Sequence, residues 1–75
     1  MEKRIELTPL EEKMLQANID CTFFPPEATE EECKAMNSVL QKAEDLMHEL
    51  KAYEEIDTNL MLWFQNKYKE QKSLH

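Results

Sequence analysis

The chain has 75 residues, carries a net charge of −7 and contains no glycine. A chain of this length forms one domain at most, and without glycine it has few positions for the tight turns of a strand-rich fold. The excess of acidic residues argues against direct binding to nucleic acid or to an anionic membrane surface. We therefore expect residues 1–75 to form a single small all-α domain, a helical bundle or hairpin of two to three helices.

The first expected helix covers residues 9–19 and follows an N-terminal arm, residues 1–7. Thr8 stands at the N-cap position, Pro9 is the first helical residue, and Glu11 lies three residues after the cap, which is the pattern of a capping box. The arm is charged and has no long apolar run. We therefore expect neither a signal peptide nor a membrane span, and we expect a cytoplasmic location.

The second expected helix covers residues 30–54 and follows a loop, residues 20–28. The loop contains two successive prolines, which cannot continue a helix, and Thr29 with Glu32 then forms a second capping box. Apolar residues recur along this helix in three adjacent rows with heptad spacing, which suits a helix packed against two neighbours. The rows are Cys33, Leu40 and Met47; Met36, Ala43 and Leu50; and Val39, Leu46 and Tyr53.

The third expected helix covers residues 57–72, and residues 73–75 are expected to be a frayed tail. Asp57, Thr58 and Asn59 are favourable at the start of a helix and unfavourable inside one, so we expect a break or kink near Asp57. The alternative is one continuous helix from the second segment through the third, about 60 Å long. Such a helix could not fold back on itself and would have to dimerise.

Groups that could support catalysis or bind a metal ion are few and far apart. Cys33 and His48 are separated by about 22 Å along one expected helix, which is too far for a catalytic dyad. Asp45 and His48 have the i, i+3 spacing of di-iron ligands, but the motif occurs once and faces away from the apolar rows. Cys21, Cys33, His48 and His75 lack the paired spacing of zinc ligands, and we expect both cysteines to be free thiols. We expect no enzyme activity, no cofactor and no metal.

The apolar surface of the second and third helices predicts a protein–protein interface. It is larger than the first helix can obviously cover, and its aromatic residues are of the kind that anchor interfaces. We expect a non-enzymatic interaction module that associates with itself as a homodimer or binds another protein. The alternative is that the third helix is buried in the chain's own core. The predicted interface residues are Met36, Leu40, Met47, Leu50, Leu60, Met61, Trp63, Phe64 and Tyr68.

The acidic clusters allow a second interpretation. They cap helices and keep a small protein in solution, but they can also imitate the phosphates of nucleic acid in a basic groove. By analogy, the chain would then be a small acidic inhibitor or regulator of the phage or mobile-element type, acting on a larger protein such as a defence nuclease. Several lysines interrupt any continuous acidic stripe, namely Lys13, Lys34, Lys42 and Lys51.

Overall fold

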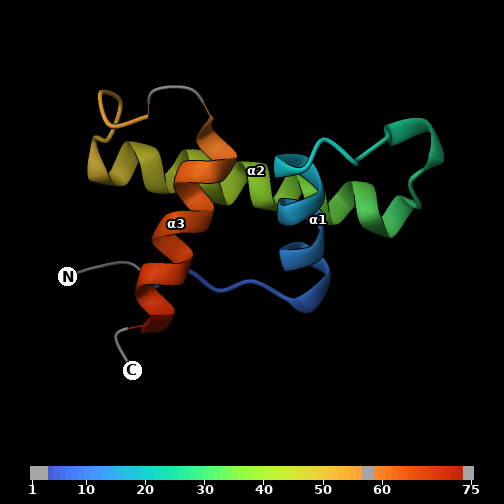
Figure 1. Cartoon of the computed structure of the whole chain (residues 1–75), viewed down its shortest axis with the longest axis horizontal. Coiled ribbons are helices and arrows are strands. Elements are labelled where there is room, and N and C mark those ends of the chain that lie inside the picture. The colour runs from blue at the N-terminus through green and yellow to red at the C-terminus, as the bar shows by residue number, and fades with distance from the viewer. Residues whose placement is uncertain (1–3, 57–58, 74–75) are drawn as a thin grey trace.

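The computed structural model describes residues 4–56 and 59–73, and within these residues it contains helices and no strand. The three α-helices are α1 (Pro9–Ile19), α2 (Glu30–Leu50) and α3 (Leu60–Ser73), and a single 3-10 turn, η1 (Pro25–Glu27), lies between α1 and α2 (Figure 1). The predicted all-α class is confirmed. Asp57 and Thr58, where the break between the last two helices was expected, lie outside the described residues.

Helices α1 and α2 begin with the two predicted capping boxes. The Thr8 hydroxyl accepts a hydrogen bond from the Glu11 N–H (3.1 Å), and the Glu11 carboxylate accepts one from the Thr8 N–H (2.9 Å). Thr29 and Glu32 repeat these two hydrogen bonds with the same lengths. Each box satisfies two N–H groups that the first turn of a helix leaves unpaired, and this fixes both helix starts.

Helix α2 ends at Leu50, four residues earlier than the predicted residue 54. Lys51 adopts the left-handed conformation (φ 52°, ψ 42°), and the N–H of Ala52 donates to the Met47 carbonyl. This terminator usually contains glycine, so the sequence offered no sign of it. Ala52 is buried in the core, and its burial offsets the cost of the sharp turn that brings the chain back to the bundle.

Helix α3 is separate from α2, so the alternative of one continuous helix is wrong. The Asn59 side chain caps α3 by accepting hydrogen bonds from the N–H groups of Met61 (2.9 Å) and Leu62 (3.3 Å). The helix therefore starts at Leu60, three residues later than predicted. Asn59 is one of the three cap-forming residues recognised in the sequence, and it is the one that lies next to the helix.

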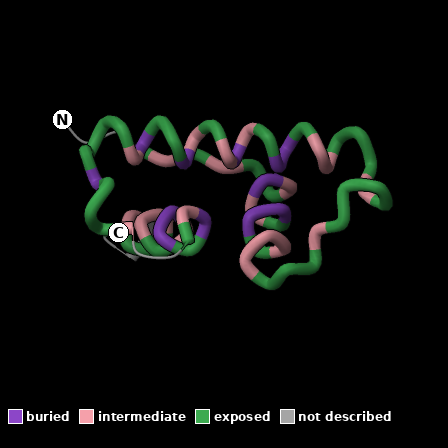
Figure 2. Tube along the Cα trace, turned by 90° about the horizontal axis from the view of Figure 1, so that it is seen from above, coloured by how far each residue is buried: buried purple, intermediate pink, exposed green. Residues whose placement is uncertain are grey.

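Helices α1 and α3 both lie crosswise on one side of α2, and the core is enclosed among the three (Figures 1 and 2). The two shorter helices run in opposite directions, since Gln65 donates to Gln16 (2.7 Å) and Tyr68 donates to Glu12. Figure 2 shows the buried positions of all three helices turned toward this shared space. The buried apolar residues are Met14, Leu15, Ala35, Met36, Val39, Ala43, Leu46, Ala52, Met61, Trp63 and Phe64.

The opposite side of α2 faces solvent along its length. Because α1 and α3 cross the middle of α2, they cover the central part of the apolar rows, where Val39 and Ala43 are completely buried. Leu50 and Tyr53, at the C-terminal end of the rows, extend past the covering helices and stay exposed. None of the helices in the described part of the chain is both long enough and apolar enough to cross a membrane.

Candidate functional site

Most of the predicted interface residues pack against other parts of the same chain. Four of the nine residues are buried in the core, namely Met36, Met61, Trp63 and Phe64. Leu40, Met47 and Leu60 are half-buried and pack against that core, and half-buried Tyr68 donates its hydroxyl hydrogen bond to Glu12. Leu50 alone among the nine is exposed, with 47% of its surface accessible. The third helix therefore follows the alternative considered for it, a helix buried in the chain's own core.

Leu50 belongs to an exposed apolar surface at the turn between α2 and α3, which we call the α2–α3 corner and define as residues Leu50–Glu55. Tyr53, 54% exposed, stands beside Leu50 in this turn. Its hydroxyl forms a 2.8 Å hydrogen bond with His48 Nδ1, and the two rings meet edge to face at 5.6 Å. An open depression runs along the corner, lined by Lys51, Ala52, Tyr53, Glu54 and Glu55. The corner combines an ordered aromatic ring with an aliphatic side chain, as interface anchors do.

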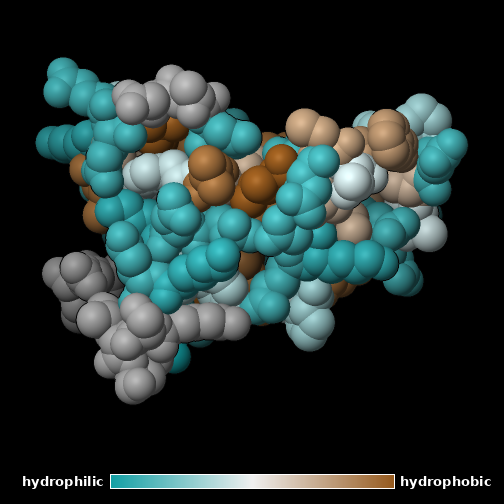
Figure 3. Space-filling view, viewed as in Figure 1, coloured by the Kyte–Doolittle hydropathy of each residue, from teal (hydrophilic) through white to brown (hydrophobic). Residues whose placement is uncertain are grey.

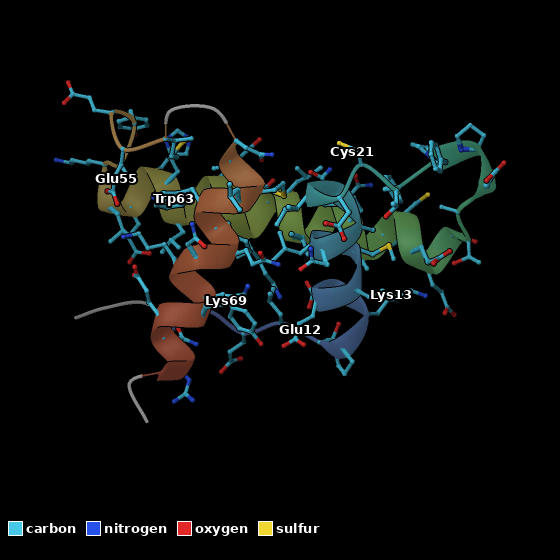
Figure 4. All side chains as sticks on the ribbon, in the orientation of Figure 1. Glu12, Lys13, Cys21, Glu55, Trp63 and Lys69 are labelled. Atoms are coloured by element: carbon cyan, nitrogen blue, oxygen red, sulfur yellow. The ribbon has the colours of Figure 1, made fainter. Side chains whose placement is uncertain are left out.

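One end of the corner is attached to α3 by charge. Lys67 Nζ lies 3.0 Å from the Glu55 carboxylate, and the hydrogen bond from Lys67 is the main reason why the pKa of Glu55 is lowered. The Trp63 side chain is a further cause of that lowering. Figure 4 shows Trp63 on α3 and Glu55 in the turn on the same side of the molecule. The corner is thus fixed relative to the core.

A buried carboxylate joins α1 to α2. Glu11 is 5% exposed, accepts a 2.7 Å hydrogen bond from the Ser38 hydroxyl and lies 2.9 Å from Lys42 Nζ. Burial by itself would raise the pKa of Glu11, but hydrogen bonds from Thr8, Ser38 and Lys42, together with the positive charge of Lys42, lower it to about 2. The partners come from the N-cap of α1 (Thr8) and from α2 (Ser38 and Lys42), so the cluster acts as a cross-link between elements.

The sequence did not reveal this cluster. Glu11 was interpreted as a capping residue, which it is, and Lys42 as an interruption of an acidic stripe. The available signal was the pair Ser38 and Lys42, four residues apart on α2 beside the buried rows, which places two polar groups on one side of the core boundary.

The residues considered for catalysis or metal binding do not come together. Asp45 accepts an exposed 2.9 Å hydrogen bond from Gln41 along α2, whereas His48 is paired with Tyr53. Cys21 is exposed and Cys33 is half-buried, and both are free thiols. His75 lies outside the described residues. Within the described part of the chain, no group of three or more His, Cys, Asp or Glu side chains could hold a metal ion.

The surface offers two further features. The exposed surface of α2 carries Lys34 together with five acidic residues, and Lys34 Nζ lies 3.5 Å from Glu30. On the other side of the molecule, a groove between α1 and α3 is lined by polar residues around Leu15, and Glu12 and Lys69 stand on its two sides (Figure 4). Figure 3 shows this side as mostly hydrophilic, with a hydrophobic strip between α3 and α1. The five acidic residues are Glu30, Glu31, Glu44, Asp45 and Glu49.

No protein-family model, no curated protein and no solved structure matches this chain.

Proposed function

We propose that the chain is a non-enzymatic protein–protein interaction module and that the α2–α3 corner is its contact surface, with a second copy of the chain as the expected partner. The observation that carries the proposal is the exposure of Leu50, at the end of the row of Met36, Ala43 and Leu50, together with the exposure of Tyr53 in the turn that follows. These apolar side chains remain exposed to water in the single chain. A partner that covers them removes apolar surface from water, which favours binding.

The order of the corner supports this assignment. The His48–Tyr53 hydrogen bond attaches the turn to α2, and the Lys67–Glu55 ion pair attaches it to α3. A preorganised surface loses less conformational entropy on binding than a flexible one. Glu49 and Glu54 are exposed beside the apolar residues, as in the polar rim of an interface.

Light scattering behind size-exclusion chromatography, over a hundredfold range of concentration, tests the proposal. We expect the molar mass to rise toward twice the 9.0 kDa of one chain. Leu50→Ser should return the mass to that of one chain. Leu62→Ser is the matched control, because Leu62 is similarly exposed (43%) but lies on α3 outside the corner. An equal effect of both variants would contradict a specific role of the corner, and a single-chain mass at every concentration would rule out self-association.

A second candidate function rests on the exposed surface of α2, which carries five acidic residues and one exposed lysine. There the chain would act as an acidic inhibitor that occupies the basic groove of a nucleic-acid-binding protein, such as a nuclease. Inhibition of a non-specific nuclease should then weaken steeply between 50 and 300 mM salt, because screening reduces the attraction. Glu44→Gln with Asp45→Asn should weaken it further, whereas inhibition that is insensitive to salt would exclude charge mimicry.

A further inference from the structure

The N-terminal arm, residues 4–7, lies in a groove formed by α2 and α3, and it is held mainly through its backbone. The Ile5 N–H donates to Gln71 Oε1 (2.6 Å), and Gln71 Nε2 donates to the Ile5 carbonyl (2.8 Å). Lys42 Nζ donates to the Glu6 carbonyl (2.7 Å). Figure 1 shows the arm passing α3 on its way to the start of α1. Contacts of this kind recognise any extended segment, because every residue other than proline offers the same N–H and C=O groups.

The arm fills its groove incompletely. A cavity of about 280 Å³ remains beside it, bounded by Ile5 and Glu6 on the arm and by Leu46 and Phe64 on the helices. Ile5, Leu46 and Phe64 supply the apolar part of the lining, and of these Ile5 is half-buried whereas Leu46 and Phe64 are almost completely buried. A larger apolar side chain in the place of Ile5 would occupy this space and bury more surface.

Charged side chains of both signs line the cavity. Arg4 and Glu6 lie on either side of Ile5 in the arm, and Asp45 and Lys42 of α2 line the same cavity. The groove thus presents an acidic and a basic group of α2 beside its apolar lining, and the basic group, Lys42, also contacts Glu11. A segment with a basic, an apolar and an acidic residue in succession matches this arrangement.

We propose that this groove is a peptide-binding site for an extended segment of a partner protein with the pattern basic, aromatic, acidic, aliphatic, and that the arm is an internal occupant which this segment displaces. A second copy's arm is a weaker candidate, since it would make the same contacts and leave the same cavity. It would also compete with an arm that is covalently attached and therefore present at high effective concentration. Only a segment that fills the cavity gains enough binding free energy to displace the attached arm. The site is distinct from the α2–α3 corner and does not depend on it.

Fluorescence anisotropy with the full-length chain and three labelled peptides tests the proposal. The first peptide has the sequence of residues 1–8, the second carries Ile5→Trp, and the third carries Ile5→Ser and Leu7→Ser. We expect the Trp peptide to bind about tenfold more tightly than the unchanged arm peptide, because it buries additional apolar surface. The Ser peptide should not bind. Equal binding of the Trp and Ser peptides would overturn the proposal.

Two variants of the full-length chain locate the binding. Ile5→Ser weakens the internal arm and leaves the groove intact, so the Trp peptide should bind more tightly to it than to the unchanged chain. Gln71→Ala in the Ile5→Ser chain removes the side chain that grips the peptide backbone and should reverse this gain. Circular dichroism verifies that both variants stay helical, and the comparison of peptides on the unchanged chain stands even where a variant fails to fold. Peptide binding that neither variant changes would place the peptide elsewhere and overturn the assignment.

The same variants separate this site from self-association through the corner. A doubled molar mass that Gln71→Ala abolishes and Leu50→Ser leaves unchanged would identify the occupant as the arm of a second copy, and this would overturn the partner assignment. A doubled mass that Leu50→Ser abolishes and Gln71→Ala leaves unchanged belongs to the corner. Tight binding of the Trp peptide together with that response supports the groove as a second, independent site.

Discussion

Glu11 shows how burial changes the role of one residue in a repeated motif. Glu11 and Glu32 occupy the same position of two capping boxes with equal hydrogen-bond lengths. Glu32 is attached to Lys13 at 3.8 Å on the surface, whereas Glu11 is enclosed by Ser38 and Lys42. Removing one partner of a buried, hydrogen-bonded ion pair leaves the other without compensation, so the same chemical change costs more at Glu11 than at Glu32.

This difference predicts the acid sensitivity of the protein. The pKa of Glu11 is lowered from 4.5 to about 2 in the folded state. The stabilisation is therefore fully present above pH 4.5 and is lost as the pH falls toward 2, and it amounts to at most about 3 kcal/mol. We expect urea unfolding to show this loss in the unchanged chain and a flatter pH profile in Glu11→Gln. Glu32→Gln is the matched control and should keep most of the pH dependence; an identical profile for both variants would contradict the role given to burial.

At the scale of elements, the end of α2 contains a residue with a strained backbone conformation, and a single substitution can relieve the strain. Lys51 adopts a left-handed conformation at the C-cap, a conformation that costs a residue with a Cβ atom about 1 kcal/mol relative to glycine. Lys51→Gly should raise the free energy of unfolding by about that amount, measured by urea titration. Lys51→Ala removes the same charge but keeps the Cβ atom, so it should bring no gain. A gain of equal size in both variants would attribute the effect to charge.

The starts of α1 and α2 could be predicted from the sequence, whereas the end of α2 and the contacts among the helices could not. Thr8 and Thr29 mark their helices through local hydrogen bonds that depend only on neighbouring residues. The end of α2 depends on a left-handed lysine and on the burial of Ala52, which are decided by the rest of the fold. The heptad rows identified the buried side of α2 but not what covers it, because α1, α3 and a second copy would satisfy the same apolar pattern.

At the scale of the whole molecule, the apolar pattern could not show which of the predicted interface residues would be buried in the core. Trp63 and Phe64 suit both a core and an interface, and the structure places them in the core. The α2–α3 corner was only partly foreseeable, since Leu50 and Tyr53 belong to the rows but their exposure follows from where α1 and α3 cross α2. The arm groove could not be predicted from the sequence, because Gln71 contacts Ile5 across 66 positions of the chain.

The crosswise arrangement also predicts that the molecule unfolds as one cooperative unit. Phe64 is 1% exposed and is among the largest fully buried side chains, and it belongs to the core that α1, α2 and α3 share. Phe64→Ala should cost about 3–5 kcal/mol, because it removes a large buried side chain and leaves a cavity. A chain of this size has a total stability on the order of 4–11 kcal/mol, so this one change removes a large part of it.

The expected result is a single unfolding transition at a much lower urea concentration, with helix content and Trp63 fluorescence lost together. Leu62→Ala on the same helix is the control and should change the free energy of unfolding by no more than about 0.5 kcal/mol, since Leu62 is exposed. Helix content that outlasts the fluorescence change would mean that α2 persists without α1 and α3. In that case the crosswise helices would be attached to α2 as separable parts, and the corner and the arm groove, which both include residues of α2, would be formed only when α3 is docked.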